Sequence, residues 1–290
     1  MPTAREERKL HSLEKIVALV ALAAVLALSL GFAQAKDPEK VFLRSAAVLV
    51  QDAASGETLL AKNEASVLPI ASITKLMTAI VVLDAGLDLE RRVAISDEDY
   101  DFVKGTRSRL RPGSVLTRNE LLLLALMASE NRAAAALSRT YPGGTEAFVT
   151  AMNAKASALR MHDTRFVDST GLSAGNVSSP HDLARLVAAA HAYPLIREYS
   201  TREQATVSVR GRAQGFRNTN GLVRSSHWDI GLSKTGYISE AGRCLVMRVR
   251  LASRELIVVL LDSWGKYSRI GDANRIRKWL ETRLAAGEHG

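Results

Sequence analysis

Three short groups of residues in this sequence could together carry out covalent catalysis. A serine hydroxyl is a weak nucleophile near neutral pH and needs an adjacent base. A lysine can be that base if burial or a neighbouring cation lowers its pKa. In chain order the three groups are Ser72-Ile73-Thr74-Lys75, Ser129-Glu130-Asn131 and Lys234-Thr235-Gly236.

The pair of Ser72 and Lys75 is distinguished from similar pairs by its surroundings. The same S-x-x-K spacing also begins at Ser12 and at Ser263, but the first lies in an N-terminal apolar segment and the second lies beyond the third group. Only the pair at Ser72 opens a predicted helix, where residues i and i+3 lie on one face. We therefore predict that Ser72 is the nucleophile and Lys75 its general base.

The second group supplies polar side chains that could assist this pair. Ser129 would relay a proton between Lys75 and the leaving amine, and Asn131 would hold Lys75 or the substrate backbone through its amide. Both side chains have donor and acceptor atoms, as such roles require. Lys234, from the third group, would be the cation whose field keeps Lys75 closer to neutral.

The third group is expected to bind the substrate. Lys234 and Thr235 would contact its carboxylate or carbonyl oxygens, and Gly236 would let an extended peptide lie against the edge of a strand. The backbone N–H groups of Ser72 and Tyr237 are predicted to form an oxyanion hole, worth about 3–4 kcal/mol per donor. A helix cap, a helix break and a strand end would explain each group alone, so the prediction rests on their combination.

The elements that position these groups follow from hydrophobic periodicity. A strand–helix–strand order, with strands near both ends of the chain and helices between them, indicates an α+β fold with an antiparallel sheet. A loop-rich stretch covers 168–180. Strands are predicted at 46–52, 58–62, 205–209, 229–234, 244–251 and 256–261, and helices at 72–85, 117–138 with a break near 129–131, 145–159, 181–191 and 267–284.

The N-terminus has the pattern of an export signal. Basic residues precede an uncharged apolar stretch, 16–35, that ends in Ala33-Gln34-Ala35. We predict that residues 1–35 are a signal peptide cleaved after Ala35. An uncleaved anchor is the alternative, because about 20 apolar residues can cross a bilayer. In either case residues 36–290 form one domain in the periplasm or another exported space.

Charge and cysteine content restrict the partners. The net charge is +9, or +8 without residues 1–35, which suits an anionic envelope surface or simply aids solubility. The basic residues are scattered and lack a DNA-binding motif, so nucleic acid is not an expected partner. Cys244 is the only cysteine and lies in an apolar run, which indicates a buried core residue. No metal or cofactor is expected, because no phosphate-binding loop or His-x-x-x-His pair occurs.

Together these motifs make the chain similar to the low-molecular-mass penicillin-binding proteins of the D-alanyl-D-alanine carboxypeptidase and endopeptidase family. The resemblance covers nearly all of residues 40–285. It implies a serine β-lactamase/D,D-peptidase-like fold with a five-stranded antiparallel sheet flanked by helices and an α-helical subdomain. It also implies a serine D,D-peptidase that acts on peptidoglycan stem peptides and cross-links and is covalently inhibited by β-lactam antibiotics. Further matching runs are Pro69-Ile70-Ala71-Ser72, Leu123-Leu124-Ala125-Leu126-Met127, Phe166-Val167-Asp168-Ser169-Thr170-Gly171-Leu172 and Phe216-Arg217-Asn218-Thr219-Asn220.

Within that family the chain most resembles the D-alanyl-D-alanine endopeptidases of the penicillin-binding protein 7 and 8 type. One reason is the Ser-Glu-Asn-Arg-Ala-Ala run at 129–134. Another is that only 54 residues follow Gly236, too few for the C-terminal β domain and amphipathic anchor of many carboxypeptidase relatives. The tail 285–290 has no apolar face, so we expect loose association with the envelope and no C-terminal membrane anchor.

Three other functions are weighed against the endopeptidase. A D-alanyl-D-alanine carboxypeptidase, which removes terminal D-Ala, is the main alternative because it would share every catalytic residue. A non-catalytic penicillin-binding sensor is less favoured, because no motif is broken. A β-lactamase of class A needs a deacylating Glu after the second group, but no Glu occurs between Glu146 and Glu198, and Glu146 is too close to Asn131.

Overall fold

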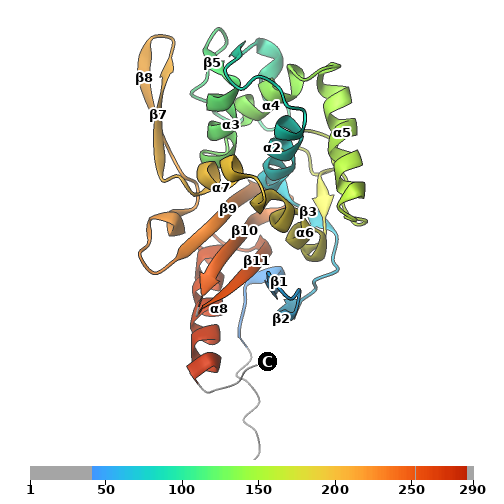
Figure 1. Cartoon of the computed structure of the whole chain (residues 1–290), viewed down its shortest axis with the longest axis vertical. Coiled ribbons are helices and arrows are strands. Elements are labelled where there is room, and N and C mark those ends of the chain that lie inside the picture. Colours follow the sequence, from blue (N-terminus) through green and yellow to red (C-terminus); the bar gives the residue numbers. More distant parts are fainter. Residues whose placement is uncertain (1–40, 252, 286–290) are drawn as a thin grey trace, which may run out of the picture. The chain divides into compact units, whose positions relative to one another are not determined.

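A five-stranded antiparallel sheet lies at the centre of the computed structural model, which describes residues 41–251 and 253–285 (Figure 1). Strands from the two ends of this region pair directly, with Val48 opposite Leu260. The predicted sheet built from both ends of the chain is therefore confirmed. The strand order is β2-β1-β11-β10-β9, formed by β1 Ser45–Asp52, β2 Thr58–Lys62, β9 Asp229–Ile238, β10 Gly242–Leu251 and β11 Arg254–Ser263.

The sheet is covered on both faces, which explains why its inner strands are apolar at almost every position. Successive side chains of a strand point to opposite faces. Val246 and Val259 join the core on the side of helix α6 (Pro180–His191), whereas Met247 and Val258 join a second core under helix α8 (Ser268–Ala285). Two cores thus sandwich one sheet.

The remaining helices gather beyond one end of the sheet (Figure 1). The predicted break between two helices is confirmed, since α3 ends at Met127 and α4 begins at Asn131. Thr117 starts α3 with a capping box that includes Glu120. These helices are α2 Lys75–Asp84, α3 Arg118–Met127, α4 Asn131–Arg139, α5 Gly144–Ala158 and α7 Pro194–Thr201, with the 3₁₀ helices η1 Ala71–Thr74 and η2 Asp97–Asp99. A third 3₁₀ helix, η3 Gly221–Arg224, precedes β9, and its Leu222 joins the core under α8.

Three small two-stranded sheets complete the fold. A hairpin of β7 Gln204–Val209 and β8 Arg212–Arg217 stands apart from the central sheet (Figure 1). Its turn contains Arg210 and Gly211, both with positive φ, as a tight hairpin turn requires. The other two pairs are β3 Leu68–Pro69 with β6 Val177–Ser178, and β4 Arg92–Ala94 with β5 Val115–Thr117.

The structure differs from the predicted elements in several places. The helix expected at 72–85 begins as the 3₁₀ helix η1 and becomes α-helical at Lys75. The strand expected to stop at residue 234 runs on to Ile238 as β9. Helix α7 and strands β4, β5 and β8 were not predicted, because they are short and lack a clear apolar period. The predicted signal peptide at 1–35 and the tail at 286–290 lie outside the described residues.

Candidate active site

Ser72 lies in the 3₁₀ helix η1, where the chain enters α2. In a 3₁₀ helix the side chains at i and i+3 are eclipsed. Lys75 is accordingly aligned with Ser72, and its Nζ donates a hydrogen bond to Ser72 Oγ at 2.8 Å. Ala71, just before the serine, has a φ of 49°, a strained conformation for a residue with a side chain. The half-buried serine therefore stands on a tightly constrained turn.

Lys75 is fully buried and surrounded by neutral acceptors. Besides Ser72 Oγ, its Nζ donates to Asn131 Oδ1 at 2.8 Å and to the backbone oxygen of Thr170 at 2.6 Å. Burial lowers the pKa of Lys75 to about 7, against the opposing fields of Asp168, Glu130 and Asp101. A substantial fraction of this amine is therefore neutral at physiological pH.

Lys234, on β9, supplies a second buried amine. Its Nζ donates to Ser129 Oγ at 2.9 Å and to the backbone oxygen of Thr235 at 2.9 Å. Burial lowers the pKa of Lys234 well below its ordinary value, and the charge on Lys75 lowers it further. The two amines repel each other, as expected from the sequence, and burial acts on both. The low pKa of Lys75 comes chiefly from its own burial, and the repulsion between the two amines is evident at Lys234.

Ser129 is held at the break between α3 and α4. Its φ of 57° places it in the left-handed region, which ends one helix and lets the next begin two residues later. Its hydroxyl contacts Lys234, whereas the expected proton relay placed it beside Lys75. The amide of Asn131 behaves as expected, because its oxygen accepts from Lys75.

The loop that contains Thr170 also contacts Lys75, a contribution to the site that the sequence did not predict. The carboxylate of Asp168 accepts hydrogen bonds from the backbone N–H groups of Thr170, Gly171 and Ser173, which confirms the prediction that it orders this loop. A Cβ at residue 171 would lie 1.9 Å from the backbone oxygen of Ala71. Only glycine lets the loop approach this closely and place the Thr170 carbonyl against Lys75.

Gly236 also allows a close backbone contact that was not predicted. A Cβ there would lie 2.8 Å from the oxygen of Ile70 and 3.2 Å from the backbone nitrogen of Ser72. The glycine thus lets strand β9 pack against the turn that carries the nucleophile, a contact that is separate from the substrate-binding role predicted for it. Tyr237 follows; the residue is 56% exposed, and the guanidinium of Arg243 is stacked over its ring.

Several residues around the site have no signal in the three motifs. Thr106 Oγ1 accepts from Asn131 Nδ2 at 3.0 Å, and the Thr219 hydroxyl is 2.6 Å from that of Thr235. Arg269 of α8 donates to the backbone oxygen of Gly236 at 2.9 Å. Each is a single polar residue whose partner is distant in sequence, so only the fold brings them together.

Other groups weighed in the sequence are also placed by the structure. Cys244 is buried in β10, and burial raises the pKa of its thiol to about 12, so it is not a reactive nucleophile. Within residues 41–251 and 253–285, no group of three His, Cys, Asp or Glu side chains is placed to hold a metal ion. Over the same ranges, no helix is both long and apolar enough to span a bilayer.

The arrangement joins a serine oxygen to a buried amine with a pKa near neutrality, beside a second amine and the edge of a sheet. Strand β9 is the edge strand, so its outer side is available to pair with an extended peptide. Such a site can take a proton from the serine, accept a peptide in extended conformation and transfer an acyl group to Ser72.

Comparison with known proteins gives consistent matches. The family model described as D-alanyl-D-alanine carboxypeptidase matches residues 33–265. A D-alanyl-D-alanine endopeptidase from Pseudomonas aeruginosa is 50% identical over 242 residues, 83% of this chain and 78% of that protein. One from Escherichia coli is 46% identical over 250 residues, 86% of this chain and 80% of that protein.

Solved structures share the same architecture. The crystal structure of the Streptomyces K15 DD-transpeptidase has a TM-score of 0.76 and 27% sequence identity to this chain, covering 82% of it and 97% of the K15 chain. A D-alanyl-D-alanine carboxypeptidase from Mycobacterium tuberculosis gives a TM-score of 0.75 at 26% identity, covering 83% and 92%. These matches confirm the fold predicted from the resemblance.

Proposed function

The chain belongs to the D-alanyl-D-alanine carboxypeptidase family of D,D-peptidases, and on this premise we propose that it is a serine D-alanyl-D-alanine endopeptidase with Ser72 as its nucleophile. One observation carries the proposal. Lys75, fully buried and with a pKa lowered to about 7, lies 2.8 Å from the Ser72 hydroxyl. An amine of this pKa is well matched to general-base catalysis near neutral pH.

The acylation step uses this pair directly. Neutral Lys75 takes the proton of Ser72 as the serine oxygen attacks the carbonyl carbon of a D-alanyl peptide bond. The backbone N–H groups of Ser72 and Tyr237 stabilise the negative oxygen that develops. The C–N bond then breaks, an ester forms on Ser72, and the amine leaves with one added proton. Water, deprotonated by Lys75, later hydrolyses the ester.

The proton carried by Lys75 must reach the leaving amine, and Ser129 is the hydroxyl that we assign to this transfer. Asn131, two residues further on, holds Lys75 in place, and Lys234 holds Ser129. Lys234 and Thr235 are assigned to the substrate carboxylate or carbonyl groups. The outer edge of β9 at Gly236 then pairs with the substrate backbone.

The preference for cross-links over terminal D-Ala is supported by the relatives. Those with 50% and 46% identity are named endopeptidases, whereas those named carboxypeptidases, such as one from Streptomyces K15, are about 31% identical or less. A carboxypeptidase is the second candidate, because the same residues would serve either reaction. We further infer that residues 36–290 act on peptidoglycan in an exported compartment and are acylated by β-lactams.

Defined substrates test this proposal. The mature chain is incubated with cross-linked muropeptide dimers and, separately, with monomeric pentapeptides, and the products are identified by mass. Release of monomers from the dimers is the expected result, and no release by Ser72→Ala is the control. Loss of terminal D-Ala alone would identify a carboxypeptidase. Equal labelling of wild type and Ser72→Ala by a fluorescent penicillin would eliminate Ser72 as the nucleophile.

A further inference from the structure

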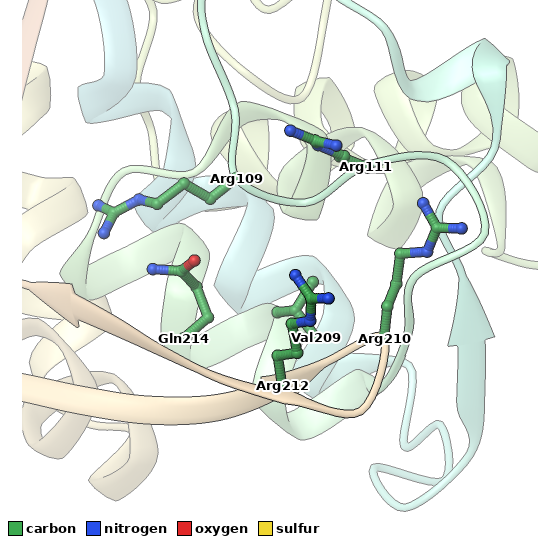
Figure 2. Close-up of a pocket in the computed structure, with 6 residues that line it drawn as sticks. All are labelled: Arg109, Arg111, Val209, Arg210, Arg212 and Gln214. Carbon is green, nitrogen blue, oxygen red and sulfur yellow. The ribbon is translucent and has the colours of Figure 1, made fainter.

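A pocket of about 480 Å³ lies between the loop that precedes β5 and the β7–β8 hairpin (Figure 2). These two segments are about 100 residues apart in sequence. Figure 2 shows the side chains of Arg210 and Arg212 extending from the hairpin toward the loop. We call this the arginine pocket, and its lining is Arg109, Arg111, Val209, Arg210, Arg212 and Gln214.

The arginine pocket has four positive charges and no negative one in its lining. Some surface arginines outside the pocket, such as Arg139, Arg248 and Arg254, pair with a carboxylate. Across residues 41–251 and 253–285, none of the four pocket arginines has such an ion pair. Their charges are therefore available to an external anion.

One of the four arginines is already ordered. Arg109 Nη1 donates to the backbone oxygen of Gly215 at 2.5 Å, and its guanidinium lies 4.4 Å from the centre of the Phe216 ring. Both contacts are on β8, so they join the loop to the hairpin and fix the shape of the pocket. A charged group held in advance loses less conformational freedom when a ligand binds.

The chemistry of this lining selects an oxyanion. Like charges brought together repel one another, and a bound anion relieves that repulsion. The planar guanidinium group binds carboxylates and phosphates through two parallel hydrogen bonds. Small-ligand sites typically occupy about 300–1,000 Å³, so the pocket can hold a group with more than one such oxyanion.

Both walls of the arginine pocket lead to the catalytic residues. On the loop, Arg109 follows Thr106 by three residues, at most about 11 Å of chain, and the Thr106 hydroxyl accepts from Asn131. On the hairpin side, β8 leads to Thr219, whose hydroxyl contacts Thr235 of β9. Gln214 is five residues before Thr219, at most about 17 Å of extended chain. These lengths are upper limits on the separation, so a substrate that extends beyond the scissile dipeptide can reach the pocket from the catalytic residues.

We propose that the arginine pocket is an exosite that binds carboxylate groups of a cross-linked peptidoglycan substrate, on stem-peptide residues remote from the scissile bond. This inference rests on the proposed function, because that function supplies an acidic peptide polymer to the cleft. A second stem peptide extends the substrate beyond the scissile dipeptide and supplies further carboxylates to the pocket. The exosite therefore favours cross-linked polymer over short peptides.

A binding experiment tests the pocket independently of catalysis. In a Ser72→Ala background, the Arg210→Gln/Arg212→Gln variant is sedimented with purified peptidoglycan from which phosphate-containing polymers have been removed. We expect roughly tenfold weaker binding at low salt, and a smaller difference at high salt because the contacts are ionic. The matched control is Arg92→Gln/Arg165→Gln, which removes the same charge from two exposed positions outside the pocket and should bind as the background does.

Kinetic measurements provide the second readout. In the active enzyme, which retains Ser72, the Arg210→Gln/Arg212→Gln hairpin variant should raise the KM for cross-linked dimers. Acylation by a small penicillin should be unchanged. Equal peptidoglycan binding by the hairpin and control variants would overturn the exosite. A defect seen only with peptidoglycan that retains its phosphate polymers would also overturn it, since the pocket would then recognise phosphate. Failure of the proposed function is distinguishable, because it would abolish penicillin labelling without changing the sedimentation result.

Discussion

Lys75 is buried with three hydrogen-bond acceptors, none of which is a carboxylate, and this environment determines its protonation. Removal from water disfavours the charged amine, while the more distant charges of Asp168 and Glu130 partly restore it. A direct ion pair would have kept the lysine protonated and useless as a base. The neutral partners leave it free to accept the proton of Ser72.

The pH dependence of acylation should report this amine. Lys75 acts as a base only when neutral, so the rate constant for acylation should rise with pH through an inflection near the Lys75 pKa of about 7. Below that pH it should fall by about tenfold per unit. Stopped-flow measurement of penicillin acylation between pH 5 and about pH 8 gives the profile.

The control for this prediction is Lys75→Arg, which keeps a positive charge but cannot provide a neutral base because guanidinium stays protonated. Its acylation should be nearly as slow as that of Lys75→Ala across the whole range. Normal acylation by the Arg variant, or a profile flat through neutral pH, would show that Lys75 is not the base.

At the scale of single residues, the sequence predicted which residues form the site better than it predicted the interactions that determine their partners and pKa values. The proximity of Ser72, Lys75 and Asn131 could be predicted because three motifs occur in order, and the hydrogen bonds confirm it. The partner of Ser129 could not be predicted, and the sequence could not show that burial, rather than the neighbouring cation, is the larger cause of the low Lys75 pKa. The Thr170 carbonyl is a backbone group that any residue could supply, so no side-chain pattern marks it.

At the scale of elements, the site depends on backbones that touch. The loop at Gly171 and strand β9 at Gly236 both press against the turn before α2, and each contact excludes a Cβ. The sequence predicted the helix and the strand but not this packing. It placed the end of the strand at residue 234, because the Thr-Gly-Tyr run that follows is less apolar than the core of the strand. The same glycine was assigned to substrate because the approaching turn is more than 160 residues away in sequence.

The Gly171→Ala variant should distinguish the effect of the contact with Ala71 from the effect of the backbone conformation at residue 171. Gly171 and Gly56 both have positive φ, near 80°, so an alanine at either position costs about 1–2 kcal/mol for its backbone alone. Only at residue 171 would the new Cβ also meet the Ala71 carbonyl. We expect a larger loss of unfolding free energy than for Gly56→Ala, measured by urea denaturation. We also expect roughly 100-fold slower acylation, because the turn carrying Ser72 must move.

Gly56→Ala should acylate at the wild-type rate, since no atom lies within 4 Å of its Cβ position. Equal acylation by the two alanine variants would mean that the loop contact does not position the nucleophile. Equal losses of stability would mean that the loop yields without strain.

At the scale of the whole described domain, the first strand and the last helix are joined by a buried carboxylate. Asp272, on α8, accepts from the backbone N–H groups of Arg44 at 3.0 Å and Ser45 at 2.7 Å, and from the Ser45 hydroxyl at 2.5 Å. These bonds fix the start of β1 to the last helix. The sequence predicted a sheet assembled from both ends, but a single aspartate in a helix gave no indication of this connection.

Asp272→Asn should weaken the connection between the start of β1 and helix α8 without changing the catalytic groups. One carboxylate oxygen becomes an amide N–H that faces donors, so the free energy of unfolding should fall by about 1–3 kcal/mol in urea denaturation. Burial raises the pKa of Asp272, but the hydrogen bonds from Ser45, Arg44 and Arg275 together outweigh burial and hold that pKa below its ordinary value. The unfolded chain therefore binds the proton more readily, and wild type loses this stabilisation as the pH falls below about 4, where the difference from the variant should shrink.

The exposed Asp229 provides the control, as Asp229→Asn should change stability by less than about 0.5 kcal/mol. A wild-type advantage that persisted unchanged at low pH would show that hydrogen bonds to the ionised carboxylate do not close the sheet.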